Sequence, residues 1–266
     1  MPKFFPMTVT EIILLNIAGF LAGFINTLAG GGSMITLAML IMVGLPAPVA
    51  NGTNRVAIFL QTLAATGSFR QQKVLDTRKA LALGIPSVLG SIIGAKIAVD
   101  INERVFERAI GVILILMLFI ILAKPKRWLK GHTEITASKV TVWQVILFFL
   151  IGIYGGFIHV GVGYFLLAGI VLGAGYDLVR ANAIKVMVVL LYVPFTLLVF
   201  MLSDQVNYLY GFIMAIGNVL GAVLASRMAV KRGSVFVQWV MVVVILLTSA
   251  DLFGLLDIKY LVSLIL

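Results

Sequence analysis

Residues 18 to 55 read AGFLAGFINTLAGGGSMITLAMLIMVGLPAPVANGTNR. The pattern predicts a membrane helix that stops at Gly30, Gly31 and Gly32, then a short apolar segment, a Pro-rich turn and the polar start of another helix. Glycine is a poor helix former, and a helix that breaks in lipid frees backbone groups that need partners. Such backbone is tolerated only where it is buried in protein or lines a wet cavity. The stretch therefore predicts an interrupted helix inside a membrane bundle.

The break has the features of an anion site. The segment that opens at Ser33 presents unpaired backbone N–H groups and the positive end of a helix dipole, and Arg55 adds a fixed charge. An alternative is that the glycines only allow close helix packing and that Arg55 extends to the membrane interface. We favour the anion site, because charge inside a membrane is usually retained for a function.

The composition is that of a helical membrane protein that crosses the bilayer several times. The 266 residues are 62% hydrophobic and 11% charged, with a mean hydropathy of +1.15, values outside the range of soluble domains. The net charge of +10 is then carried by loops that set topology, so nucleic acid is excluded as a partner. With no cysteine, and with His132 and His159 as its two imidazoles, the chain offers no metal or cofactor site.

Most apolar runs are long enough to span a membrane, and two are too short to span it, 33–44 and 162–174. Each short run follows a Gly-rich break and is predicted to be a half-helix or a re-entrant segment. The order of a broken helix, a short run and three long runs occurs twice. This predicts internal repeats at about 8–125 and 140–254, joined by the basic loop 124–139. The longer runs lie at about 10–29, 49–69, 80–99, 105–123, 140–158, 181–202, 208–229 and 235–253.

Small and polar residues support the duplication because they recur at aligned positions. Arg55 also lies one position from the counterpart of Lys185. The glycines and alanines of the later helices are predicted to form helix-packing faces. The aligned pairs are Asn26 with His159, Gly30 with Gly163, Asn51 with Asn182, and Gly84, Gly90, Gly94, Ala95 and Ala98 with Gly211, Gly217, Gly221, Ala222 and Ala225.

Loop charge orients the two repeats. Lysine and arginine crowd the loops 70–79, 124–139 and 227–234, which predicts a cytoplasmic position for all three. The segment 203–207 carries only Asp204 as a charged residue and is predicted to lie outside. The two repeats then have opposite orientations. This is the arrangement of many secondary transporters, whose substrates bind near the midplane at broken helices.

The chain has no motif for enzyme chemistry or nucleotide hydrolysis, so we predict that it is not an enzyme. Each half places a cation and polar donors in the first turns of the helix that follows its short run. Such a set suits a small oxyanion such as sulfite, sulfate or a sulfonate. For Lys185, extension to the interface is an alternative. The residues are Asn51, Thr53, Asn54 and Arg55 in the first half and Asn182 and Lys185 in the second.

Asn26 and His159 precede the two breaks at aligned positions. His159 could carry a proton that couples anion movement to the pH gradient, because imidazole changes charge near neutral pH. Alternatively, it is a hydrogen-bonded structural residue. Gln61, Tyr164 and Tyr192 are weaker candidates for lining residues.

Two stretches carry a resemblance to a known family. GFLAGFINTLAGGGSMITLAMLIMVGLPAPVANGTNR resembles the N-terminal signature of the TauE/SafE sulfite exporter family, and GGFIHVGVGYFLLAGIVLGAGYDLVRANAIKV resembles that family's degenerate second repeat. The resemblance covers nearly the whole chain and implies transport of small, usually sulfur-containing anions across the inner membrane. The second half departs from the pattern, with no Gly triplet and with Ile184 where Thr53 stands. The family's motif residues fall on Gly30, Gly31, Gly32, Thr53, Asn54 and Arg55.

The sequence therefore predicts an all-α membrane protein of two inverted repeats, each with a Gly-broken helix, a half-helix and three long helices. We predict a secondary transporter for a small sulfur-containing anion in the inner membrane, with protons as the coupling ion if it is coupled. An anion channel and a membrane assembly factor without transport are the alternatives. The expected partners are the anion and the lipid bilayer, and a homodimer is compatible with this interpretation. The predicted substrate-binding residues are Asn26, Gly30, Gly31, Gly32, Ser33, Asn51, Thr53, Asn54, Arg55, His159, Gly163, Asn182 and Lys185.

Overall fold

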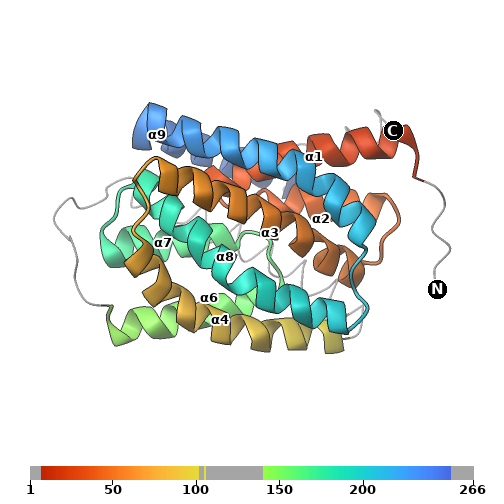
Figure 1. Ribbon diagram of the computed structural model, residues 1–266, viewed down its shortest axis with the longest axis horizontal. Coiled ribbons are helices and arrows are strands. Elements are labelled where there is room, and N and C mark those ends of the chain that lie inside the picture. The colour runs from red at the N-terminus through yellow and green to blue at the C-terminus, as the bar shows by residue number, and fades with distance from the viewer. Residues whose placement is uncertain (1–6, 102–104, 106–139, 253–266) are drawn as a thin grey trace.

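The computed structural model describes residues 7–101, 105 and 140–252, with side chains placed up to residue 244. Nearly all of the span predicted at 105–123, the basic loop 124–139 and His132 lie outside the described residues. Within the described residues every regular element is an α-helix (Figure 1). In chain order the helices are α1 Val9–Leu28, α2 Ser33–Met42, α3 Ala47–Gln71, α4 Thr77–Asp100, α6 Val142–Phe157, α7 Val162–Ala174, α8 Leu178–Leu202 and α9 Tyr208–Leu252.

Two helices end inside the bundle and are followed at once by short ones. The chain between α1 and α2 contains Gly30 with φ +99°, and the chain between α6 and α7 contains Gly161 with φ +71°. These φ values are readily adopted by glycine alone. Inside α9 the backbone of Gly233 is also non-helical, with φ +76°, so α9 consists of two helical segments that meet there. The sequence prediction separates them at 230–234.

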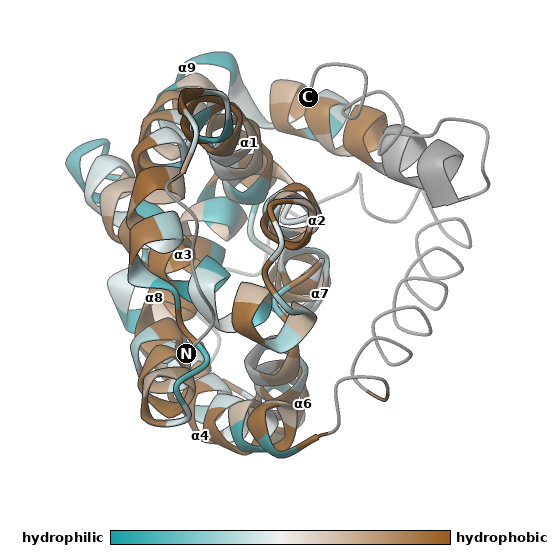
Figure 2. Cartoon of the chain, turned by 90° about the vertical axis from the view of Figure 1, so that its right-hand side faces the viewer, coloured by the Kyte–Doolittle hydropathy of each residue, from teal (hydrophilic) through white to brown (hydrophobic). Residues whose placement is uncertain are grey.

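The outer faces of the long helices are apolar. Four described helices, α1, α4, α8 and α9, are long and apolar enough to cross a membrane. Residues four apart share one face of a helix, and such stripes of large apolar side chains are exposed on the long helices. Figure 2 shows that hydrophobic residues make up much of the helices of the bundle. A protein in water rarely exposes so much apolar surface, so these faces are suited to lipid. The exposed stripes include Ile85, Leu89, Ile93 and Ile97 on α4 and Phe212, Ile216, Leu220 and Leu224 on α9.

The first helix of each half of the chain packs against the last helix that the structure describes in the other half. α1 packs mainly against α9, and α6 packs mainly against α4. Between these two pairs lie α3 and α8, which contact each other and also contact α9 and α4 respectively (Figure 1). The interior position of α3 explains why a helix with so many polar residues is stable in the bundle. The residues from Ala50 to Ile58, among them Asn51, Thr53 and Arg55, are buried without interruption.

Glycines set the close approach of the paired helices. A Cβ on Gly23 of α1 would overlap the backbone of Asn218 on α9, and a Cβ on Gly156 of α6 would overlap the backbone of Ser91 on α4. Four of the six packing glycines predicted on the later helices behave in the same way, whereas a Cβ on Gly84 or Gly211 would first meet a side chain, of Leu191 or Val56. Those with backbone atoms of a neighbouring helix at the same short range are Gly90, Gly94, Gly217 and Gly221.

Hydrogen bonds join the two halves of the chain at both ends of the bundle. At one end the Tyr176 hydroxyl donates to the Asp76 carboxylate at 2.6 Å. At the other end the backbone N–H of Asn207 donates to the Thr53 hydroxyl at 2.8 Å. Burial alone would raise the pKa of the Asp76 carboxyl. The hydrogen bonds from Tyr176 and from backbone amides outweigh that effect, so the pKa of Asp76 is lowered.

Candidate functional site

The end of α1 is capped by a cation from the other half of the chain. Lys185 on α8 donates from Nζ to the carbonyl oxygens of Asn26 at 2.8 Å and Thr27 at 3.0 Å, and to Oδ1 of Asn182 at 2.6 Å. The last carbonyls of a helix have no partner within the helix. Lys185 therefore satisfies acceptors that α1 would otherwise bury unpaired. Three acceptors occupy all three N–H groups of an ammonium ion.

Arg55 on α3 caps the end of α6 in the same manner. Its Nη1 donates to the Gly155 carbonyl at 2.8 Å and to Oγ1 of Thr196 at 3.2 Å, and its Nη2 donates to the Gly156 carbonyl at 2.7 Å. The guanidinium also lies 5.1 Å from the ring centroid of Phe200, within the range of a cation–π contact. Its Nε has no hydrogen-bond partner among the described residues. Each half of the chain thus supplies a cation that caps the end of a helix in the other half, Lys185 for α1 and Arg55 for α6.

The beginnings of the two short helices meet at the centre of the bundle. A Cβ on Gly30 would overlap the backbone of Gly163, and a Cβ on Gly163 would overlap the backbone of Gly30. No larger residue fits at either position unless the backbone moves. The positive ends of the α2 and α7 dipoles therefore lie in one small region.

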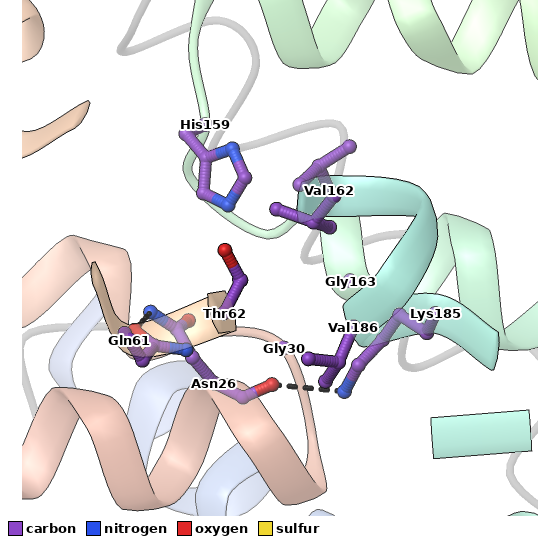
Figure 3. Close-up of a pocket in the computed structure, with 10 residues that line it drawn as sticks. Asn26, Gly30, Gln61, Thr62, His159, Val162, Gly163, Lys185 and Val186 are labelled. Carbon is purple, nitrogen blue, oxygen red and sulfur yellow. Dashed lines mark hydrogen bonds between the residues drawn. The ribbon is translucent and has the colours of Figure 1, made fainter. Parts of the chain in front are cut away.

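A pocket lies beside the contact between Gly30 and Gly163 (Figure 3). Figure 3 shows His159 and Thr62 on one side of it and Asn26, Gln61 and Lys185 on another. The pocket has room for about one water molecule. Its lining consists of Asn26, Gly30, Gln61, Thr62, His159, Val162, Gly163, Lys185, Val186 and Val189.

Asn26 connects the pocket to the start of α2. Its Oδ1 accepts the backbone N–H of Ser33 at 3.1 Å, and its Nδ2 donates to Oγ of Ser33 at 3.0 Å and to Oε1 of Gln61 at 3.3 Å. One of the amides that the sequence analysis assigned to an anion is therefore occupied by a side chain in this structure. An anion that took this amide would first have to displace Asn26.

His159 is the group in the pocket that can exchange a proton near neutral pH. Its Nδ1 lies 3.0 Å from the hydroxyl of Tyr192 on α8. The tautomer of the ring decides which of the two donates. His159 is also within electrostatic range of both Arg55 and Lys185. A positive charge on a protonated His159 would therefore be repelled by both Arg55 and Lys185.

The structure brings five of the predicted site residues together around the pocket and leaves eight outside its lining. Ser33 and Asn182 are each one hydrogen bond from it, through Asn26 and Lys185. The five in the lining are Asn26, Gly30, His159, Gly163 and Lys185. The eight outside it are Gly31, Gly32, Ser33, Asn51, Thr53, Asn54, Arg55 and Asn182.

Of the predicted residues outside the lining, Asn51, Thr53, Gly31 and Gly32 contact other parts of the bundle, whereas Oδ1 of the buried Asn54 has no hydrogen-bond partner among the described residues. Asn51 donates to the Phe157 carbonyl at 2.9 Å, at the end of α6. Thr53 accepts the Asn207 amide at one end of the bundle, away from the pocket. A Cβ on Gly32 would overlap the backbone of α1. At Gly31 the nearest group is the hydroxyl of Tyr164, which is buried and has no hydrogen-bond partner among the described residues.

Thr62 and Val189 line the pocket, and Thr196 bonds to Arg55, although the sequence analysis did not single them out. A helical signal was available. Lys185, Val189, Tyr192 and Thr196 follow spacings of four, three and four along α8, so they share one face. The face that carries Lys185 therefore predicts the other three. Within the described part of the chain no three His, Cys, Asp or Glu side chains gather as they would to hold a metal ion.

Comparison with known proteins gives a consistent result. The model of the family described as "Sulfite exporter TauE/SafE" matches residues 15–252. "Probable membrane transporter protein ORF9" of Sinorhizobium sp is 28% identical over 234 residues, which cover 88% of each chain. A "Probable membrane transporter protein" of Haemophilus influenzae is 27% identical over 247 residues, 91% of this chain and 94% of that protein. "Probable membrane transporter protein YfcA" of Escherichia coli K12 is 27% identical over 258 residues, 95% of this chain and 94% of that protein. No solved structure matches the chain significantly.

Proposed function

Because the chain belongs to the sulfite exporter TauE/SafE family, we propose that it is a secondary transporter that moves a small sulfur-containing anion across the inner membrane. The observation that carries this proposal is the central pocket, where polar side chains and Lys185 lie inside an apolar helical bundle. Charge within a membrane bundle usually serves a function. Substrate sites of secondary transporters commonly lie where interrupted helices meet.

Two inverted repeats would build this site. The packing of the halves supports the repeat. Gly23 and Gly156 are separated by the same number of residues as the aligned pair Asn26 and His159, and Gly23 packs on the backbone of α9 as Gly156 packs on the backbone of α4. Gly30 and Gly163 occupy matching positions and contact each other, as residues on a two-fold axis would. The inversion is supported by the loops 72–76 and 203–207, which follow the matching helices α3 and α8 and lie at opposite ends of the bundle (Figure 1).

The anion would bind between the beginnings of α2 and α7. Helix N-termini offer N–H groups and positive potential to an oxyanion, and the capping of α1 and α6 by Lys185 and Arg55 keeps the opposite, negative helix ends satisfied. The Tyr164 hydroxyl beside Gly31 adds a buried donor without a partner among the described residues. In this proposal Arg55 does not contact the anion. Its charge attracts the anion, and its hydrogen bonds hold the end of α6 in place.

Transport would require the bundle to open. A sulfur oxyanion has at least four heavy atoms, and the pocket has room for about one water, so the structure corresponds to a closed state. The contacts between Asp76 and Tyr176 at one end, and between Thr53 and Asn207 at the other, would break alternately. Protonation of His159, relayed by Tyr192, would couple the movement to the pH gradient.

Uptake into proteoliposomes tests this function. Purified protein would be reconstituted and exposed to labelled sulfite, sulfate, thiosulfate, sulfoacetate and a simple carboxylate, with and without a pH gradient. We expect saturable uptake of at least one sulfur anion, and faster uptake when vesicles are preloaded with the same anion, because a carrier exchanges substrate across the membrane. His159→Gln should keep exchange but lose the response to the pH gradient.

Other outcomes favour the alternatives. Flux that does not saturate and that preloading does not accelerate would identify an anion channel. A folded protein that transports none of the panel, under either condition, would contradict the proposal and favour an assembly role.

A further inference from the structure

Two cations lie in the core of the bundle without an acidic partner among the residues that the structure describes. Arg55 is 0% exposed and Lys185 is 1% exposed. Their hydrogen bonds go to carbonyl oxygens, to the Thr196 hydroxyl and to the Asn182 side-chain amide. Each of these acceptors is neutral. The dipolar groups accept hydrogen bonds from Lys185 Nζ and from both Nη atoms of Arg55, but they do not neutralise the two charges.

The acidic side chains that the structure describes lie elsewhere. No Asp or Glu occurs in α2, α3, α6, α7 or α8. The ion pair found within the described residues, between Arg180 and Asp177, is at the surface, with side chains 60% and 48% exposed. The described acids lie at helix ends or in loops, and they are Glu11, Asp76, Asp100, Asp177 and Asp204. The other acids lie outside the described side chains, and they are Glu103, Glu107, Glu134, Asp251 and Asp257.

Helix dipoles do not change this balance. Each helix terminus carries about half an elementary charge. The negative ends of α1 and α6 contribute about −1 together, and the positive ends of α2 and α7 at the same centre contribute about +1. These partial charges cancel, so among the described residues the region keeps the two full charges of Arg55 and Lys185. Charge that is buried without a counter-charge is costly, and a bound anion would remove that cost.

From this charge balance we infer that the transported anion carries two negative charges. The inference rests on the proposed function and narrows its substrate class to dianions. While His159 is neutral, a dianion neutralises the centre, whereas a monoanion of the same size leaves one buried charge without a partner. Selectivity for charge two would then arise from the number of cations in the core, with no need for a dedicated contact to each charge.

Two sulfonates of similar size test the inference. Sulfoacetate carries two charges at neutral pH, and isethionate, which has a hydroxymethyl group in place of the carboxylate, carries one. Neither changes its charge between about pH 6 and 8, because carboxylates and sulfonates are fully ionised there. Labelled uptake of both would be measured in proteoliposomes at equal concentration. We expect the wild type to prefer sulfoacetate by about tenfold or more, the effect of one charge-assisted interaction.

Lys185→Gln removes one of the two charges and should lower the preference for sulfoacetate by about ten- to a hundredfold. Lys96→Gln makes the same substitution at an exposed position on α4 and should leave the preference unchanged. If Lys185→Gln does not fold, the wild-type ratio decides the question.

Equal uptake of the two sulfonates by the wild type would overturn the inference and leave the proposed function intact. An unchanged ratio in a folded Lys185→Gln variant would also overturn it. Failure of the proposed function would be seen separately, as an absence of uptake across the whole anion panel.

Discussion

Replacement of Arg55 by methionine separates two roles that the sequence could not separate. Methionine is unbranched and flexible, so it can fill much of the space while it removes every donor. The Gly155 and Gly156 carbonyls then lose their partners at the end of α6. Thr196 loses one bond but keeps its own bond to the Val193 carbonyl. The structure therefore predicts that the first effect of this change is on folding stability.

The size of the effect follows from the lost bonds. A buried polar group left without a partner costs about 1 to 3 kcal/mol, so two carbonyls cost about 2 to 6 kcal/mol. Hydrogen bonds between membrane helices average about 0.6 kcal/mol, and three of them give about 2 kcal/mol. Both estimates therefore reach at least about 2 kcal/mol. For a chain of this size that is a fall of about 4 °C or more in the unfolding temperature.

Thermal unfolding in nanodiscs, followed by tryptophan fluorescence, measures this fall. Arg180→Met is the matched control, because Arg180 is exposed and its ion pair with Asp177 is 3.7 Å long. Surface pairs contribute about 0 to 1 kcal/mol, so the control should change little. Arg55→Lys should be intermediate, since an ammonium keeps the charge but loses the planar fork. A wild-type unfolding temperature in Arg55→Met, together with lost transport, would refute the capping argument and make Arg55 a ligand.

Two further substitutions test the centre and one end of the bundle. Gly163→Ala would push a methyl group into the backbone of Gly30, so unfolding temperature and uptake should both fall. Gly173→Ala on the same helix is the control, because a Cβ there would have no neighbour closer than 3.5 Å. It should be neutral or stabilising by up to about 1 kcal/mol. Similar effects of the two substitutions would contradict the packing argument. Tyr176→Phe removes a hydrogen bond that helps to lower the pKa of Asp76. A carboxylate with a lowered pKa stabilises the fold above its ordinary pKa and loses this effect as pH falls through the folded value. The wild-type advantage in unfolding temperature should therefore be complete above about pH 5 and shrink below the ordinary value of 3.8, and an advantage that is equal at every pH would refute this linkage.

The positions of the long membrane helices could be predicted from the sequence, because they depend on runs of neighbouring apolar residues. Membrane-spanning length and apolar character predicted α1, α4 and α8 with small errors at their ends, because the energy of burying a helix in lipid is a sum over neighbouring residues. The alignment of the two halves placed Asn26 opposite His159 and Gly30 opposite Gly163, and all four line one pocket.

The partners of the two cations could not be read from the sequence. Arg55 contacts carbonyls about one hundred residues away in the chain, and Lys185 contacts carbonyls still further away. A buried cation inside a bundle can face an anion, a helix end or the membrane interface, and residue type does not distinguish them. Their burial shows that the interpretation of either residue as extending to the interface was wrong. The choice between ligand and cap depends on how the halves dock, which no local pattern specifies.

The exchange of caps between the halves also constrains how the bundle can move. Neither α1 nor α6 has its last carbonyls satisfied until α8 and α3 dock against them, so each half completes the fold of the other. The central contacts are charge-assisted, and such bonds are about twice as strong as neutral ones. At the end that holds Thr53, the bond to the Asn207 amide is neutral, and at the other end Asp76 is partly exposed to solvent. Movement that opens one end should therefore pivot about the centre, where Gly30 meets Gly163, because breaking an end contact costs less than exposing Arg55 or Lys185 without acceptors.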